Sequence, residues 1–397
     1  MNEPLAPLRD AGAPGAGGTA APFHPAIAER LLAWYDEHAR DLPWRRTRDP
    51  YKILVSEIML QQTQVKTVLP YYEAFVRRFP SVSALARAPV DEVLEVWKGL
   101  GYYRRARNLH AAAQAVVERF GGRVPDTWEE MIGLPGIGAY TAAAVLSIAY
   151  GKPYPVVDGN VIRVGARLLA DEEPADSVRL KRRIFSGLSQ VIPVERPGDF
   201  NQALMELGAT VCSVRRPVCA ACPIAAHCAA RASGRAEELP VPARRATVRE
   251  DRFTVIVARL GQATLLVRRP EDGLLAGLWE FPRAASVPEG EDEKDFVRAA
   301  LHAAGAGAVD VRYVERAGAV VHRFSHLEWR MEVLRVELAA ATRASGAAER
   351  AASDARWVSA AELEALALPR AMQKVWETAK AFDAPVRESG RGFRGTG

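Results

Sequence analysis

The sequence predicts two folded parts of different class, an all-α part followed by a smaller α+β part. Up to about residue 228, apolar residues recur at helical spacing and no convincing period-two strand is present. Residues 230–250 then combine Pro, Gly and charges without periodicity, which predicts a linker. Beyond it, residues 327–333 alternate between apolar and charged side chains, which is typical of a half-buried strand.

The all-α part is expected to span residues 23–229. Pro25 lies where the first turn of the first helix begins. Thr127, with Glu130 three residues on, has the capping-box pattern, whereas Asp91 is placed to cap a helix alone. Helices are predicted at 25–40, 53–72, 91–97, 102–120, 127–132, 140–150 and 161–169.

The α+β part is expected to span residues 251–384. Its strands are predicted at 253–260, 263–267 and 327–333, and its helices at 293–304 and 359–366. Ser359 is placed to cap the last helix, with Glu362 three residues on. Residues 1–22 and 385–397 are expected to be disordered tails.

Composition places the chain among soluble globular proteins. With 397 residues it can hold two or three domains, and 49% apolar and 25% charged residues are ordinary fractions. The first 22 residues lack the apolar block of a signal peptide, and no apolar run approaches the roughly 18 residues of a membrane span. We therefore expect a cytoplasmic protein without a membrane partner. A net charge of +5 is compatible with nucleic acid but does not require it.

Glu57 is the first candidate for chemistry, because it is a single carboxylate in an apolar stretch. If that stretch is helical, its neighbours one turn away include no cation: Ile53, Leu54, Leu60 and Gln61. Burial raises the pKa of such a carboxyl group, which can then act as a general acid near neutral pH. A Glu facing solvent is the plain alternative. The polar run at 61–64, which could bond bases and phosphates, favours the functional interpretation.

Two glycine-containing turns, at 98–103 and 135–140, have similar sequences and each joins a pair of predicted helices. In the second, Gly136 and Gly138 precede an Ala-rich helix and leave backbone N–H groups uncovered at its start. Such a helix end attracts an anion, for example a DNA phosphate. A turn without a ligand is the alternative interpretation.

Asp158 is placed as the N-cap of the helix predicted at 161–169. Donors at a helix start favour the ionised carboxylate, so Asp158 could face a developing positive charge. A protonated Glu57 and an ionised Asp158 would be two carboxyl groups with pKa values pushed apart, as an acid and its partner require.

All four cysteines lie within 17 residues, with the spacing C-x6-C-x2-C-x5-C. They predict one closed metal site formed by Cys212, Cys219, Cys222 and Cys228. A structural zinc site usually has two close pairs, so a [4Fe–4S] cluster fits this spacing better, and disulfides are the remaining alternative. Arg215 and Arg216 give the loop a cationic surface that suits a phosphate backbone.

These segments together resemble the helix-hairpin-helix DNA glycosylases with an iron–sulfur cluster, the endonuclease III superfamily, and within it the adenine-specific MutY family. The similarity is carried by SEIMLQQTQV, GLGYYRRARNLH, LPGIGAYTA, VDGNVIRV, FNQALMELG and the cysteine spacing. The implied fold is an all-α helix-hairpin-helix glycosylase domain with a [4Fe–4S] loop at 212–228. The implied substrate is double-stranded DNA with adenine opposite 8-oxoguanine or guanine, bound by a monomer.

The resemblance also implies residue roles. Glu57 would protonate the leaving adenine, Asp158 would stabilise the sugar cation or its adduct, and Asn160 would orient the catalytic groups. Tyr140 stands where strand-cleaving branches carry a lysine that forms a Schiff base, so base excision without efficient strand cleavage is expected. Gln62 and Tyr102 would wedge into the duplex beside the lesion. The adenine pocket would be walled by Trp44, Arg45 and Gln202. Further contacts to DNA are expected from Leu100, Gly136 and Gly138.

The α+β part resembles a Nudix domain through LLVRRP, GLWEFP and a following helix. Nudix hydrolysis needs a glutamate-rich helix that holds Mg²⁺, but residues 298–305 of this chain carry no carboxylate. The resemblance instead implies a reader of 8-oxoguanine, with Ser325 and His326 in its recognition loop. Two alternatives stay open: a thymine or other mismatch glycosylase on the same scaffold, and a non-catalytic DNA-binding protein.

Overall fold

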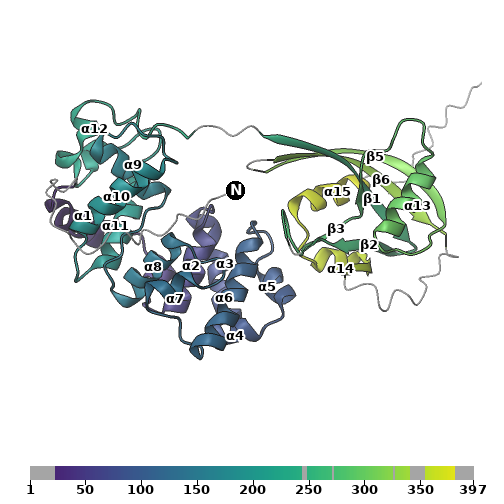
Figure 1. Cartoon of the computed structure of the whole chain (residues 1–397), viewed down its shortest axis with the longest axis horizontal. Helices are drawn as coiled ribbons and strands as arrows, with labels where there is room; N and C mark the ends of the chain where they lie inside the picture. Colours follow the sequence, from purple (N-terminus) through teal and green to yellow (C-terminus); the bar gives the residue numbers. More distant parts are fainter. Residues whose placement is uncertain (1–22, 244–247, 271, 325–326, 340–353, 381–397) are drawn as a thin grey trace, which may run out of the picture. The chain divides into compact units, whose positions relative to one another are not determined.

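The chain divides into two compact units after Arg245 (Figure 1). The computed structural model describes residues 23–243, 248–270, 272–324, 327–339 and 354–380, so both predicted tails lie outside these ranges. The first unit is helical and the second is built on one sheet, which confirms the predicted order of fold classes. No helix in these ranges is both long enough and apolar enough to cross a membrane.

The first unit packs its helices around a core of aliphatic and aromatic side chains, among them the fully buried Phe75, Trp97 and Phe200. Its longer helices are α1 (Ala26–His38), α2 (Pro50–Leu60), α3 (Val65–Arg78), α6 (Arg104–Phe120), α8 (Ala139–Tyr150), α9 (Gly159–Leu169), α10 (Val178–Val191) and α11 (Pro197–Thr210). Shorter helices are α4 (Val82–Arg87), α5 (Val90–Val96), α7 (Trp128–Ile132) and α12 (Ala229–Ala232).

The stretch at 53–72, predicted as one helix, is two helices. Helix α2 ends at Leu60 and α3 begins at Val65. Between them Gln62 has a φ of 56°, in the left-handed region that residues other than Gly rarely adopt. The break leaves Gln62 exposed at the end of an otherwise buried helix.

The predicted helix caps at Thr127 and Ser359 are confirmed. The Thr127 hydroxyl accepts a hydrogen bond from the Glu130 N–H, and Ser359 forms a complete capping box with Glu362. Asp91 is not a cap, because α5 begins one residue earlier and Pro89 occupies the N-cap position. Proline has no N–H and fits the start of a helix, where that donor would have no partner.

Much of the segment predicted as a linker packs on the first unit. Leu239 is buried, and its carbonyl accepts a hydrogen bond of 2.8 Å from Arg167 Nε. The carbonyl of Val241 accepts another from the Ala175 N–H at 2.9 Å. These contacts extend the helical unit to at least Val241.

In the second unit, the described strands form one seven-stranded sheet in the order β3-β2-β1-β6-β5, with β4 paired to β1 and β7 to β2. Strands β1 and β6 run parallel and the other pairs antiparallel. Trp329, Met331 and Val333 are buried, as their alternation predicts. The strands are β1 (Arg249–Leu260), β2 (Ala263–Arg268), β3 (Trp279–Glu280), β4 (Arg283–Ala284), β5 (Val311–Arg323), β6 (Leu327–Leu338) and β7 (Ala355–Ser359).

Helices cover both faces of this sheet (Figure 1). On one face, α13 (Glu293–Ala303) buries Phe296 and Leu301 in a cluster with Ile256 of β1. On the other, α14 (Ala360–Ala365) and α15 (Arg370–Lys380) pack apolar side chains, including Met372, against Val333 of β6. The sheet is thus the middle of three layers.

Gly198 yields a stability prediction, because α11 begins in direct contact with the end of α8. A Cβ at Gly198 would lie 2.7 Å from both Ile148 Cα and the Ser147 carbonyl oxygen. Backbone atoms cannot move aside cheaply, so Gly198→Ala should lower the free energy of unfolding by roughly 1–3 kcal/mol. Urea unfolding followed by circular dichroism at a helix-sensitive wavelength measures this.

The matched control is Gly159→Ala, where a Cβ would meet nothing within 4 Å. This control should stay within about 0.5 kcal/mol of wild type. Equal losses in the two variants would contradict the packing argument.

Candidate active site

A cavity of about 570 Å³ opens among α2, α8, α9 and α11 of the first unit. This volume is within the ordinary range for small-molecule pockets. Glu57, Tyr140 and Asp158 line it together, so the two carboxyl groups singled out from the sequence meet at one place. Asn160, Trp44, Arg45 and Gln202 line it as well.

Glu57 is buried in α2 and is 4% exposed. Burial raises the pKa of Glu57 to about 7, while a hydrogen bond from the Tyr140 hydroxyl opposes the rise and the nearby Asp158 adds to it. That hydrogen bond joins Tyr140 Oη and Glu57 Oε2 at 2.5 Å. The predicted burial and raised pKa are confirmed, so a protonated carboxyl group is available near neutral pH.

Asp158 caps α9, as predicted. Its Oδ1 accepts from the Val161 N–H at 2.7 Å and its Oδ2 from Asn160 Nδ2 at 2.9 Å. The donors at the helix start were expected to favour the ionised carboxylate, and they do lower its pKa, but burial has the larger effect. Burial raises the pKa of Asp158 above its ordinary value, against the opposing hydrogen bonds from Val161 and Asn160.

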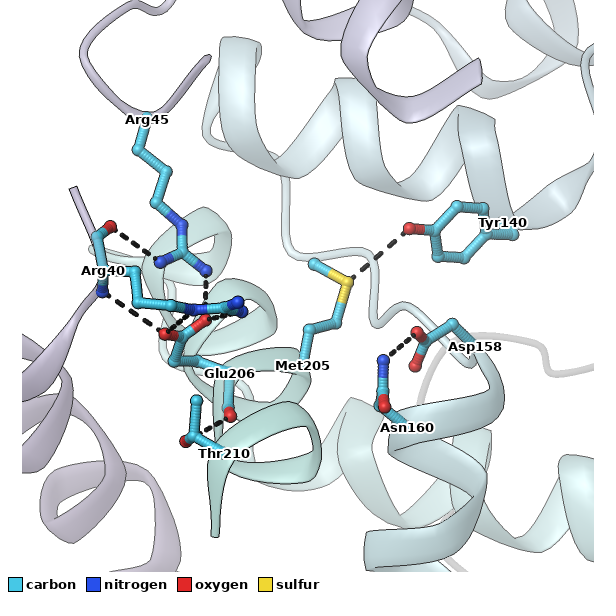
Figure 2. A network of polar contacts seen from close by, with 8 residues as sticks. All are labelled: Arg40, Arg45, Tyr140, Asp158, Asn160, Met205, Glu206 and Thr210. Atoms are coloured by element: carbon cyan, nitrogen blue, oxygen red, sulfur yellow. Dashed lines mark hydrogen bonds and ion pairs between the residues drawn. The ribbon is translucent and has the colours of Figure 1, made fainter. Parts of the chain in front are cut away.

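Arg45 and Glu206 form a charged wall on one side of the cavity (Figure 2). The fully buried Glu206 accepts hydrogen bonds from Arg45 Nη2 at 2.8 Å and from Arg40 Nε at 2.6 Å. Burial works against the charge of Glu206, but these hydrogen bonds outweigh it and lower the pKa of Glu206 below its ordinary value. The wall therefore holds an ionised Glu206, paired with Arg40 and Arg45, in the same cavity as Glu57 with its raised pKa.

Sequence reasoning did not assign Glu206, Arg40 or Met205 to the site. Met205 Sδ lies 3.5 Å from the Tyr140 hydroxyl, and Figure 2 shows it between Tyr140 and the charged wall. The available signal was the one that identified Glu57: Glu206 is also a carboxylate within an apolar helical run.

Three of the residues predicted to contact DNA, among them the two expected to wedge into the duplex, differ in exposure. Gln62 and Tyr102 are both exposed, Tyr102 by 54%. Leu100, by contrast, is buried with 5% exposure. Gln62 and Tyr102 can therefore reach a partner as the structure stands, whereas Leu100 cannot.

The turn before α8 has the geometry of an anion site. Gly136 and Gly138 are exposed, and Gly138 is the N-cap of α8 without a side-chain cap. Gly136 has a φ of +70°, and a Cβ there would lie 2.4 Å from Asn108 Cβ, so only glycine fits. The uncovered N–H groups at this helix start suit a phosphate.

The four cysteines line one small cavity, and none is in a disulfide. Burial raises the pKa of Cys222 to about 11, with the other three cysteines adding to the rise. Arg167 Nη1 lies 3.2 Å from Cys212 Sγ, and Arg163 joins the Cys212 carbonyl to Asn160 Oδ1 by hydrogen bonds of 2.8 Å each. Within the described ranges, no three or more His, Cys, Asp or Glu side chains are grouped to hold a single metal ion.

Ser325 and His326, predicted to read the opposite base, lie outside the described residues. In the sequence they are flanked by β5, which ends at Arg323, and β6, which begins at Leu327. Phe324 donates its N–H to the Leu327 carbonyl at 2.7 Å, and its ring packs edge-on against Trp329.

Comparisons with known proteins agree with this architecture. Residues 55–186 match the HhH-GPD superfamily base excision DNA repair proteins, and residues 253–378 match the NUDIX domain. The adenine DNA glycosylase of Homo sapiens is 37% identical over 88% of this chain and 73% of its own length. That of Rattus norvegicus is 38% identical over 88% and 77%, and that of Arabidopsis thaliana 39% over 79% and 57%. Among solved structures, a thermostable thymine-DNA glycosylase is 31% identical, covers 52% of this chain and 96% of its own, and has a TM-score of 0.48.

The raised pKa of Glu57 predicts a pH-dependent stability difference. Its pKa of about 7 exceeds the ordinary 4.5, so wild type loses stability as the pH rises between these values and does not regain it above. Glu57→Gln keeps the shape and an acceptor for Tyr140 but has no charge to bury. The variant should exceed wild type by about 3 kcal/mol at pH 8 and by about 1 kcal/mol at pH 5.

Urea unfolding at the two pH values measures this difference. Glu118→Gln, on the exposed face of α6, is the matched control and should show no such dependence. A Glu57→Gln difference that is equal at pH 5 and pH 8 would show that the carboxyl group is not protonated in the folded state.

Proposed function

Because this chain belongs to the adenine DNA glycosylases of the HhH-GPD superfamily, we propose that it releases adenine mispaired with 8-oxoguanine or guanine in double-stranded DNA. As a base-excision-repair enzyme it hydrolyses an N-glycosidic bond. The observation that carries the proposal is the meeting of Glu57 and Asp158 in one cavity, the first with a pKa of about 7.

Glu57 is the proposed general acid. Adenine is a poor leaving group until a ring nitrogen is protonated, and the protonated Glu57 carboxyl can supply that proton inside the cavity. The Tyr140 hydroxyl, bonded to Glu57 Oε2, fixes the orientation of the carboxyl group.

Asp158 is the proposed partner of the sugar. Loss of the base leaves a cation-like deoxyribose, and a second carboxyl group can stabilise that charge or form an adduct, as in glycoside hydrolysis. Asp158 is held in one orientation by the Val161 N–H and by the Asn160 side chain, which supports a positioning role for Asn160.

Adenine must leave the base stack to reach these groups. Trp44, Arg45 and Gln202 are the proposed pocket wall, and all three line the cavity. Gln62 and Tyr102 are the proposed residues that fill the gap left in the duplex, consistent with their exposure. Gly136 and Gly138 are proposed to bind the phosphate backbone.

We infer that the enzyme does not cut the strand efficiently. Strand cleavage by an amine nucleophile forms an imine at the sugar carbon, and Tyr140 cannot form one. One chain carries every proposed catalytic group, which supports action as a monomer. The proposed substrate places the enzyme in the compartment that holds the DNA. Ser325 and His326 remain the proposed readers of the opposite base.

We further propose that Cys212, Cys219, Cys222 and Cys228 hold a [4Fe–4S] cluster. Four free thiols around one cavity are the required donor set. When bound, the cluster supplies four metal–thiolate bonds that fix the loop. The thiols must lose their protons to bind, so the raised pKa values of Cys222 and Cys228 make loading pH-dependent.

The substrate prediction uses duplexes with A:8-oxoG, A:G, T:G or U:G, each assayed with and without alkali. Wild type should release adenine only, and strand breaks should form only after alkali. Glu57→Gln should slow adenine release by roughly 10²–10⁴-fold, the usual contribution of a general acid. Glu118→Gln should match wild type. A Glu57→Gln rate within about tenfold of wild type would remove Glu57 from its role, and release of thymine would favour the thymine-mismatch alternative.

The cluster prediction is tested by chemical analysis. Purified protein should contain iron and inorganic sulfide in equal amounts, about four of each per chain. Cys222→Ser should lose most of both, whereas Val214→Ser, which changes an exposed side chain of the same loop outside the cysteine cavity, should retain them. Zinc in place of iron, or a metal content unchanged in Cys222→Ser, would contradict the proposed cluster.

A further inference from the structure

Arg105, in the first turn of α6, is a buried cation whose hydrogen-bond partners are neutral oxygens. One guanidinium nitrogen, Nη1, donates to three carbonyl oxygens at the end of α2. The acceptors are Ile58 at 3.0 Å, Met59 at 2.7 Å and Gln61 at 2.5 Å. Arg105 therefore occupies the position that would continue α2, where the last carbonyl groups of a helix have no intrahelical partner.

The other terminal nitrogen of Arg105 ties in the loop before α6. Nη2 donates to the Thr63 hydroxyl at 3.0 Å and to the Gly101 carbonyl at 3.2 Å. The guanidinium also lies over the Tyr102 ring, 5.3 Å from its centroid. One side chain thus joins the turn at 61–64 to the turn at 99–103.

Both turns hold their exposed tip residues in strained backbone. Gln62 has a φ of 56° and Tyr102 a φ of 49°, and neither is glycine. Such conformations cost free energy and persist only where surrounding contacts determine them. Arg105 supplies these contacts on both sides, to Gln61 and Thr63 around the first tip and to Gly101 and Tyr102 at the second.

We propose that Arg105 is a positioning residue that holds Gln62 and Tyr102 as one preformed wedge for the duplex. This inference rests on the proposed function, since it assigns Arg105 to base extrusion and not to the chemical step. The planar fork of arginine can serve both turns at once. The three donors of a lysine ammonium radiate from one atom and cannot span them.

The electrostatics of Arg105 favour this role over a purely structural one. Burial lowers the pKa of Arg105 to about 10, so the buried cation is held at a cost in solvation. A buried charge without a carboxylate partner is a poor source of stability. The buried Arg105 instead fixes the geometry of the two tip residues, Gln62 and Tyr102.

The test compares Arg105→Lys with wild type in two full-length assays under single-turnover conditions. In the first, 2-aminopurine beside the mispaired adenine reports unstacking by its fluorescence when the protein binds. In the second, adenine release is measured from two duplexes. One is paired on both sides of the mispair, and in the other the bases next to the adenine are left unpaired. Arg105→Lys should weaken the fluorescence rise and slow release from the paired duplex roughly ten- to a hundredfold. Release from the unpaired duplex should change less than about threefold, because little unstacking is left to do.

Two further variants keep the result interpretable. Arg104→Lys changes the exposed neighbouring arginine in the same conservative way and should match wild type in both assays. Thr63→Val removes one acceptor of Arg105 and should show a smaller loss of the same pattern. In a Tyr102→Ala background, Arg105→Lys should cost less than it does alone, because coupled residues are not additive.

Equal losses on the two duplexes, or an unchanged fluorescence rise in Arg105→Lys, would overturn the proposal. If Arg105→Lys does not fold, Thr63→Val takes its place, alone and combined with Tyr102→Ala in a double-mutant cycle. The fluorescence rise and the difference between the two duplexes then decide in the same way. A wrong mispair assignment would give a different result, because wild type would then release no adenine from either duplex. The fluorescence difference between wild type and Arg105→Lys would still decide the role of Arg105.

Discussion

The structure depends on the burial of one carboxyl group, that of Glu57, among apolar side chains of α2. Desolvation raises its pKa to about 7, and the Tyr140 hydroxyl at 2.5 Å gives the group a fixed direction. Asp158 adds to the rise, whereas Tyr140 and Arg45 oppose it without restoring the ordinary pKa. The stability sacrificed by burying an acid is what makes a proton available at neutral pH.

Close helix packing brings the second carboxyl group to the same place. A Cβ at Gly208 of α11 would lie 2.6 Å from Asn160 Cβ, so only glycine lets α11 approach the start of α9 this closely. Asn160 then reaches back to Asp158 and is itself held by Arg163. The cavity is thus fixed by backbone approach as well as by side-chain hydrogen bonds.

The sequence predicted those features that depend on local pattern. The burial of Glu57, the cap at Asp158, the capping box at Ser359 and the change from helices to a sheet follow from periodicity and residue type. Features set by distant partners were missed. The break after Leu60 is stabilised by Arg105, more than forty positions along the chain. The packing of 230–243 depends on Arg167 and Ala175, which nothing in its own composition indicates.

Two carboxyl groups of one cavity show why burial alone does not determine chemistry. Glu57 and Glu206 both sit in apolar helices, and desolvation is the largest influence on each. Glu206 receives hydrogen bonds from Arg40 and Arg45, and these lower its pKa despite burial. Glu57 receives one from a neutral hydroxyl, which cannot offset the lost hydration. The number of cations within hydrogen-bonding reach therefore decides which carboxyl group carries the proton and which carries the charge.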